Sequence, residues 1–153
     1  MNSFKYTTSI GNIIITADDF AITQIKTDSS SDNADLSASS KLTDLAAKQI
    51  DEYLAGVRKE FDLPLRPVGT AFQQSAWNAL VTIPYGETRS YKQIAQMLNN
   101  PKACRAVGMA NNKNPIWIVI PCHRVIGAGG SLVGYGGGLD MKKKLLDLEK
   151  HFS

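Results

Sequence analysis

Hydrophobic and polar positions change their spacing about a third of the way along the chain. Short apolar stretches at 4–8, 13–16 and 20–26 are separated by turn residues, a pattern typical of strands joined by tight turns. We therefore expect a small antiparallel sheet. From Leu42 to Leu54 the apolar residues recur at helical spacing, with a glycine at position 56. This pattern predicts an amphipathic helix that covers one face of the sheet.

The second half of the chain is predicted to be mostly helical. Thr70 with Gln73, and Ser90 with Gln93, have the spacing of a capping box, and each pair precedes an apolar stripe. A third helix is predicted from about residue 102 to 110. The last two helices are short and are joined by a tight turn, which is typical of a helix-turn-helix.

Two further apolar runs predict strands. Residues 61–65 could form one before a proline-containing linker, and the run 116–120 could form another that ends at Pro121. We therefore expect an α/β (α+β) fold. A scaffold domain over residues 1–66 would contain the small antiparallel sheet and its helix, and a mostly helical domain would span residues 67–153.

Charge is distributed unevenly between the two halves. The chain has a formal net charge of +3, but residues 1–62 carry net −4 and residues 63–153 carry net +7. The basic half favours a polyanionic partner, with nucleic acid as the leading candidate, although basic surface can also serve solubility alone. The sequence has no apolar run long enough to cross a bilayer and no signal-peptide pattern, so we expect no membrane partner and a cytoplasmic location.

The cysteine count limits the possible chemistry. Cys104 and Cys122 are the only cysteines, and their spacing fits neither a disulfide framework nor a CxxC site. With His123 and His151 they supply too few ligands for a structural zinc site. We expect no metal.

Cys122 is the strongest candidate for a reactive group. It follows the predicted strand 116–120, is adjacent to His123, and precedes the glycine-rich stretch 127–138. A thiol is mostly protonated at neutral pH and needs a base or a cationic neighbour to become a nucleophile. His123 could act as that base through a water molecule, because adjacent side chains seldom meet in extended backbone.

The second helix of the predicted helix-turn-helix is unusual for a reader of DNA sequence. Residues 103–110 are mostly small, and Arg105 is the one long cationic side chain among them. A reader of the major groove would display several arginine, asparagine or glutamine side chains. Small residues instead suit a shallow, sequence-tolerant groove contact, or they simply allow tight helix packing.

Several motifs together carry a resemblance to a known family. They are Ile-Pro-Cys-His-Arg-Val-Ile-Gly at 120–127, Tyr135 with Gly-Gly-Leu at 137–139, Asn-Pro-Lys-x-x-Arg-Ala-Val-Gly at 100–108, Asn-Pro at 114–115, and Ile-Pro-Tyr-Gly-Glu-Thr-x-Ser-Tyr at 83–91. Over residues 70–150 the chain resembles the O6-alkylguanine-DNA alkyltransferases. The first half is similar to that family in length and pattern, which implies a ribonuclease H-like scaffold beside a winged-helix-like helix-turn-helix.

The resemblance implies DNA repair by direct transfer. Cys122 would accept the alkyl group from O6-alkylguanine, and also from O4-alkylthymine, irreversibly and once per molecule. His123 would activate the thiol through water, and Glu149 would orient His123, in a relay similar in logic to hydrolytic triads. No cofactor is implied.

The resemblance also implies the residues that bind DNA. The target base would be flipped out of the duplex, with Arg105 filling the vacated space and Tyr91 donating to the ring of the base. The remaining implied contacts are Lys102, Ala103, Cys104, Ala106 and Gly108 on the helix, Asn114 and Arg124 beside the nucleophile, and Val125, Tyr135, Gly136 and Gly137 around the base. The partner would be double-stranded DNA containing O6-alkylguanine. The protein would act as a monomer, with cooperative binding left open.

Three alternatives remain beside this reading. An alkyl-lesion sensor without turnover would lack the cysteine, and a helix-turn-helix transcription regulator would need base-reading side chains. A papain-like hydrolase would have its histidine far downstream of the nucleophile rather than next to it.

Overall fold

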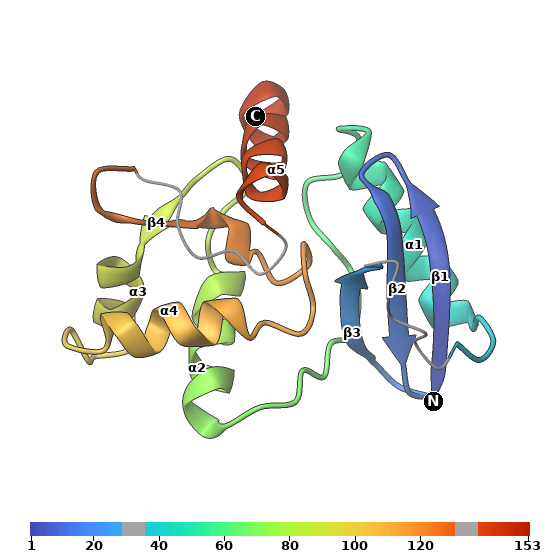
Figure 1. Ribbon diagram of the computed structural model, residues 1–153, viewed down its shortest axis with the longest axis horizontal. Helices are drawn as coiled ribbons and strands as arrows, with labels where there is room; N and C mark the ends of the chain where they lie inside the picture. Colours follow the sequence, from blue (N-terminus) through green and yellow to red (C-terminus); the bar gives the residue numbers. More distant parts are fainter. Residues whose placement is uncertain (29–35, 131–137) are drawn as a thin grey trace. The chain divides into compact units, whose positions relative to one another are not determined.

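The computed structural model describes residues 1–28, 36–130 and 138–153. Its chain divides into two compact units (Figure 1). One unit contains residues 1–68 together with 115–117, and the other contains residues 69–114 and 118–153. The segment 115–117 thus belongs to the first unit although the residues on both sides of it belong to the second, a feature that the sequence analysis did not foresee.

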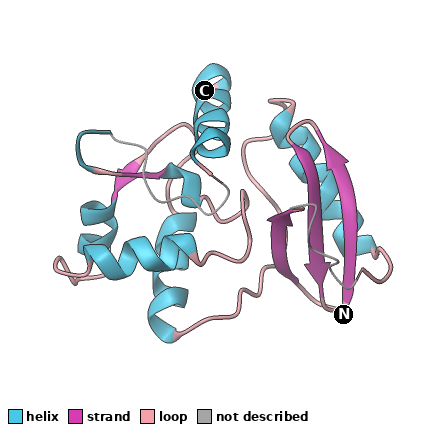
Figure 2. Cartoon of the chain, viewed as in Figure 1, coloured by secondary structure: helices cyan, strands magenta, loops and turns pink. Residues whose placement is uncertain are grey.

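The first unit is the predicted sheet with its helix. Strands β1 (Asn2–Thr8), β2 (Gly11–Ala17) and β3 (Ile22–Thr27) pair antiparallel in that order. Helix α1 (Lys41–Leu54) lies along one face of the sheet (Figures 1 and 2). It begins at a capping box formed by Ser40 and Thr43, which satisfies backbone N–H groups of the first turn. The fold predicted for this half is confirmed.

The core of the first unit explains why β2 is apolar throughout. Ile13, Ile14 and Ile15 are each at most 2% exposed, so both faces of this central strand are covered. Consecutive strand residues point to opposite faces, and a half-exposed strand would have alternated instead. The predicted strand 61–65 is reduced to a single bridge between Leu65 and Ile22.

The second unit is mostly helical, as predicted (Figure 2). Its helices are α2 (Ala71–Val81), α3 (Tyr91–Met97), α4 (Cys104–Asn112) and α5 (Leu139–Phe152). Two short strands, β4 (Arg89–Ser90) and β5 (Val125–Ile126), pair in parallel. The 3-10 turns η1 (Cys122–Arg124) and η2 (Ala128–Gly130) flank β5.

Capping boxes begin two of these helices where the sequence placed them. Thr70 with Gln73 caps α2, and Ser90 with Gln93 caps α3. The buried Trp77 then ties α2 to α4, because its indole N–H donates to the Ala110 carbonyl at 2.9 Å. Helices α3 and α4 form the predicted helix-turn-helix, held against this buried tryptophan.

The strand predicted over residues 116–120 is wrong. Only Ile116 makes a bridge, to Ile25 of β3, and the next residues form turns. Ile118 has a φ of 72°, a conformation that a β-branched residue rarely adopts. The run is apolar because it is buried on its way from one unit to the other, and burial alone does not distinguish a strand from a turn.

Candidate active site

The tight turn η1 presents Cys122. The Cys122 N–H donates to the Ile120 carbonyl at 2.8 Å, and the Arg124 N–H donates to the Pro121 carbonyl at 3.0 Å. The Cys122 residue is 2% exposed. The nucleophile therefore begins a 3-10 turn inside the second unit instead of ending a strand, and a reagent can reach its sulfur only by entering that unit.

His123 is fixed by a carboxylate from the last helix. Its Nε2 lies 2.5 Å from Glu149 Oε2, and both residues are at most 1% exposed. Because a carboxylate only accepts, neutral His123 donates its Nε2–H and carries its lone pair on Nδ1. Nδ1 is then the atom that can take up a proton.

Arg124 binds the same carboxylate and is buried. Its Nε donates to Glu149 Oε1 at 2.8 Å, one terminal nitrogen donates to Oε2 at 3.0 Å, and the other donates to the Ile83 carbonyl at 2.7 Å. The expectation that Arg124 contacts DNA needs correction, because the residue is only 7% exposed and three of its five N–H groups are already engaged inside the protein. We reassign Arg124 as a residue that holds Glu149.

Glu149 also accepts a hydrogen bond from a backbone N–H group. Gly86 N–H donates to Oε1 at 3.1 Å, and Gly86 has a φ of 79°, which glycine adopts at little cost. A side chain added at Gly86 would lie 2.9 Å from Ser153. The Pro-Tyr-Gly turn at 84–86 therefore positions a backbone hydrogen-bond donor for Glu149.

The electrostatics keep His123 neutral and Glu149 ionised. Burial lowers the pKa of His123, and the nearby charges of Arg124 and Lys142 lower it further, against the opposing effect of Glu149. Burial alone would raise the pKa of Glu149, but its contacts with His123 and Arg124 prevail and hold the pKa at about 2. A neutral imidazole beside a permanent carboxylate is the form that can accept a proton from a thiol.

Acid is expected to destabilise the protein in two ranges of pH. Unfolded His123 takes up a proton below about pH 6.5 while the folded residue stays neutral, so the free energy of unfolding falls as the pH decreases. Unfolded Glu149 takes up its proton near pH 4.5 but the folded residue only near 2, which removes a further ~3 kcal/mol between these values. Urea unfolding between pH 8 and pH 2 measures both ranges.

Two variants test whether His123 causes the loss of stability in the upper of these two pH ranges. His123→Gln should remove the pH dependence of stability between about pH 6.5 and 5, because no titrating imidazole remains at the buried position. His151→Gln, which alters an exposed histidine, should leave that dependence in place. An unchanged slope in His123→Gln would contradict the assignment.

Three polar side chains bind the backbone on either side of Cys122. Asn114 Nδ2 donates to the Ile120 carbonyl at 2.9 Å, Asn111 Nδ2 donates to the Cys122 carbonyl at 3.3 Å, and Lys142 Nζ donates to the Val125 carbonyl at 2.5 Å. All three donors are at most 3% exposed. The carbonyls of the nucleophile turn are thus held from α4, from the segment after α4, and from α5.

Sequence reasoning missed Asn111 and Lys142. Lys142, Leu145 and Glu149 lie on one face of α5 and are all buried, so their helical spacing already placed the lysine beside the predicted carboxylate. Asn111 follows the buried Val107 and Ala110 on the inward face of α4. For both residues, the helical spacing of the apolar positions around them could have shown that they face inward.

The DNA contacts implied at the start of α4 and just before it separate into exposed and buried residues. Lys102, Arg105 and Ala106 are exposed, and Cys104 and Gly108 are half-buried. Ala103 is 9% exposed, so little of its side chain is accessible, and its contact with DNA stays a prediction.

Val125 has both backbone groups engaged. Its N–H donates to the Cys122 carbonyl, and its carbonyl accepts from Lys142. Tyr135, Gly136 and Gly137, which were expected around the base, lie outside the described residues.

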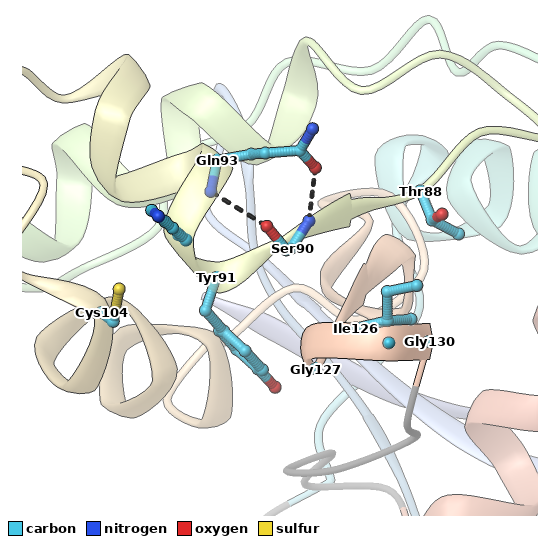
Figure 3. Close-up of a pocket in the computed structure, with 10 residues that line it drawn as sticks. Thr88, Ser90, Tyr91, Gln93, Cys104, Ile126, Gly127 and Gly130 are labelled. Carbon is cyan, nitrogen blue, oxygen red and sulfur yellow. Dashed lines mark hydrogen bonds between the residues drawn. The ribbon is translucent and has the colours of Figure 1, made fainter.

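A pocket of about 570 Å³ lies beside the helix-turn-helix (Figure 3). It is lined by the start of α3, by Cys104 of α4, and by the backbone after β5, including Gly127 and Gly130. Tyr91 extends into this region from the start of α3 (Figure 3). A Cβ added at Gly108 would lie 3.8 Å from the Tyr91 ring, an ordinary contact distance, so the ring lies against this position of α4.

Two further properties concern the described residues alone. Within them, no group of three or more histidine, cysteine, aspartate or glutamate residues is placed to hold a metal ion. No helix in the described part of the chain is long and apolar enough to cross a membrane.

The fold and the site define a class of protein, namely one in which a helix-turn-helix unit holds a buried cysteine next to a buried histidine that binds a carboxylate. Family models agree with this class. The model described as the DNA binding domain of 6-O-methylguanine DNA methyltransferase matches residues 71–151, and the model described as its ribonuclease-like domain matches residues 4–67.

Individual relatives carry related names. Proteins named methylated-DNA–protein-cysteine methyltransferase are 62% identical over 104 residues in Methanosarcina acetivorans and 60% identical over 106 residues in Mycobacterium leprae. These matches span 68% and 69% of this chain, and 67% and 64% of the relatives' own lengths. A crystal structure of Mycobacterium tuberculosis OGT in complex with DNA is 42% identical with a TM-score of 0.92, and the match covers 100% of this chain and 95% of that one. The chain belongs to the 6-O-methylguanine DNA methyltransferase family.

Proposed function

We propose that the protein repairs DNA by transferring the alkyl group of O6-alkylguanine directly to Cys122. The observation that carries this proposal is the buried Cys122 next to a neutral His123 whose ring is fixed by Glu149. The names of the relatives supply the reaction, since those proteins are called methylated-DNA–protein-cysteine methyltransferases.

The residues of the site account for each step of the transfer. His123 Nδ1 accepts the thiol proton through an intervening water molecule, and the thiolate attacks the alkyl carbon. A sulfur–carbon bond forms as the bond between that carbon and O6 breaks. The electron pair of the broken bond stays with the base, which takes up a proton at N1 and becomes ordinary guanine. Because a thioether is a poor leaving group, each molecule acts once.

The burial of Cys122 requires the target base to leave the duplex. A thiol that is 2% exposed cannot reach an atom inside a base stack, so the nucleotide must rotate into the second unit. Exposed Arg105 on α4 is placed to fill the gap that the base leaves, and exposed Lys102 is placed to contact phosphate. The small residues of α4 allow close approach to the minor groove. The same machinery would accept O4-alkylthymine.

The hydroxyl of Tyr91 is suited to donate to the flipped base. Burial raises its pKa, and the nearby Cys122 raises it further, so the phenol keeps its proton at neutral pH. A phenolic O–H can bind a ring nitrogen of the base and offset the negative charge that develops on the base as the bond between the alkyl carbon and O6 breaks.

Intact mass spectrometry tests the proposed transfer. Protein mixed with a duplex that contains O6-methylguanine is expected to gain the mass of one CH2 group, because a methyl replaces the thiol hydrogen. Peptide mapping should locate the methyl on Cys122 and not on Cys104. With excess duplex the gain should stop at one group per molecule, and the same duplex with unmodified guanine is the control. Tight binding without any gain would contradict the proposal and indicate a lesion sensor without turnover.

A further inference from the structure

Asn111 lies where the DNA-facing helix meets the nucleophile. It is 3% exposed near the end of α4. Its Nδ2 donates to the Cys122 carbonyl at 3.3 Å, so the orientation of its amide is fixed, because a carbonyl cannot donate and the nitrogen must face it.

The same amide reaches the Tyr91 hydroxyl. Gly108 precedes Asn111 by three residues on α4, so both lie on the same side of the helix, and the Tyr91 ring lies against Gly108. The side chain of Asn111 hydrogen-bonds Tyr91, and this bond lowers the pKa of the phenol against the effect of burial. Asn111 Oδ1 accepts no hydrogen bond within the described residues, so the amide nitrogen makes the bond and donates it to the phenol oxygen. The direction of the effect on the pKa agrees, because a donated bond stabilises the phenolate.

We propose that Asn111 sets the direction in which the Tyr91 hydroxyl donates its proton. An amide N–H can only donate, so Tyr91 Oη must accept from Asn111. Its own O–H hydrogen must then point away from the amide, where a base nitrogen can accept it. Asn111 is thus a positioning residue for the transfer, and this inference rests on the proposed function.

A double-mutant cycle tests the proposal on the full chain. The rate of methyl transfer from an O6-methylguanine duplex is measured for Asn111→Leu, Tyr91→Phe and the double variant. Each single variant is expected to slow transfer about tenfold, the loss of one oriented hydrogen bond. In the Tyr91→Phe background, Asn111→Leu should cost no more than about twofold, because no hydroxyl remains to orient. Equal slowing in both backgrounds would overturn the proposal.

Asn111→Asp allows a measurement, the pKa of Tyr91, that a purely structural role of Asn111 would leave unchanged. A carboxylate has no hydrogen to donate, so it would accept from the Tyr91 hydroxyl and turn its hydrogen away from the base. The pKa of Tyr91, followed by NMR of 13C-labelled tyrosine and assigned by its absence in Tyr91→Phe, should rise in both Asn111→Asp and Asn111→Leu. An unchanged pKa would also overturn the proposal.

Asn2→Leu is the matched control. Asn2 also donates from its amide to a backbone carbonyl, that of Ala38 at 3.1 Å, but it lies in the first unit. Its replacement should leave both the transfer rate and the Tyr91 pKa unchanged. If the wild-type protein transfers no methyl group, the proposed function fails. If it transfers but the cycle shows no coupling, only the role of Asn111 fails.

Discussion

Cys122→Ala is expected to abolish methyl transfer while the protein still binds duplex DNA. The substitution removes the only atom in the described site that is placed to become a nucleophile beside His123. It changes neither exposed Arg105 on α4 nor exposed Lys102, which precedes that helix. Deleting one buried sulfur should cost about 1 kcal/mol of stability, which is small compared with the 5–15 kcal/mol typical of a folded domain.

Three measurements on matched variants check this expectation. Mass spectrometry should show no gain for Cys122→Ala, whereas Cys104→Ala should still gain one methyl group on Cys122. Fluorescence anisotropy should give Cys122→Ala a Kd for the duplex within about twofold of wild type, because phosphate contacts supply most of the binding. Loss of DNA binding together with transfer would contradict the separation of the two roles.

Glu149→Gln is expected to damage both stability and transfer. Glutamine keeps the size of the side chain but removes the charge, so the buried guanidinium of Arg124 loses its counterion. Breaking one partner of a buried pair costs ~3–5 kcal/mol. Without the carboxylate, His123 loses the contact that fixes its ring and tautomer, and transfer should slow by about 100-fold or more.

Two further variants distinguish the loss of stability from the loss of methyl transfer. Glu87→Gln breaks an exposed pair with Arg89 and should cost less than about 1 kcal/mol, as exposed pairs do. Adding Arg124→Met to Glu149→Gln should recover stability, because the unpaired charge is gone, yet transfer should stay as slow as in Glu149→Gln. If the double variant regained its transfer rate, Glu149 would act only through stability.

The sequence predicted those parts of the fold that local rules determine. Capping boxes at Thr70 and Ser90 placed the starts of α2 and α3 because a cap acts within one helical turn. The path of residues 116–120 could not be predicted in this way. It depends on Ile116 pairing with Ile25, a residue far away in sequence, and a run that is mostly buried looks the same in a strand and in a turn.

The site was predictable to a similar degree. Cys122 and His123 are adjacent in sequence, so this pair alone indicated a thiol with a base beside it. Glu149 came from the family resemblance, since nothing local connects residue 149 with residue 123. Arg124 was assigned to the DNA contacts from the family resemblance, and only the structure shows the carboxylate that holds it.

The segment 115–117 limits how the protein can be divided. These residues complete the first unit through the bridge of Ile116 to Ile25, and Cys122 follows only a few positions later. A fragment that begins at residue 69 would keep every catalytic side chain, but it would expose the otherwise fully buried Ile116 next to the turn that carries the thiol. The first unit is consequently not an exchangeable module, and domain shuffling that replaced residues 1–68 would have to supply a new strand partner for the middle of the catalytic half.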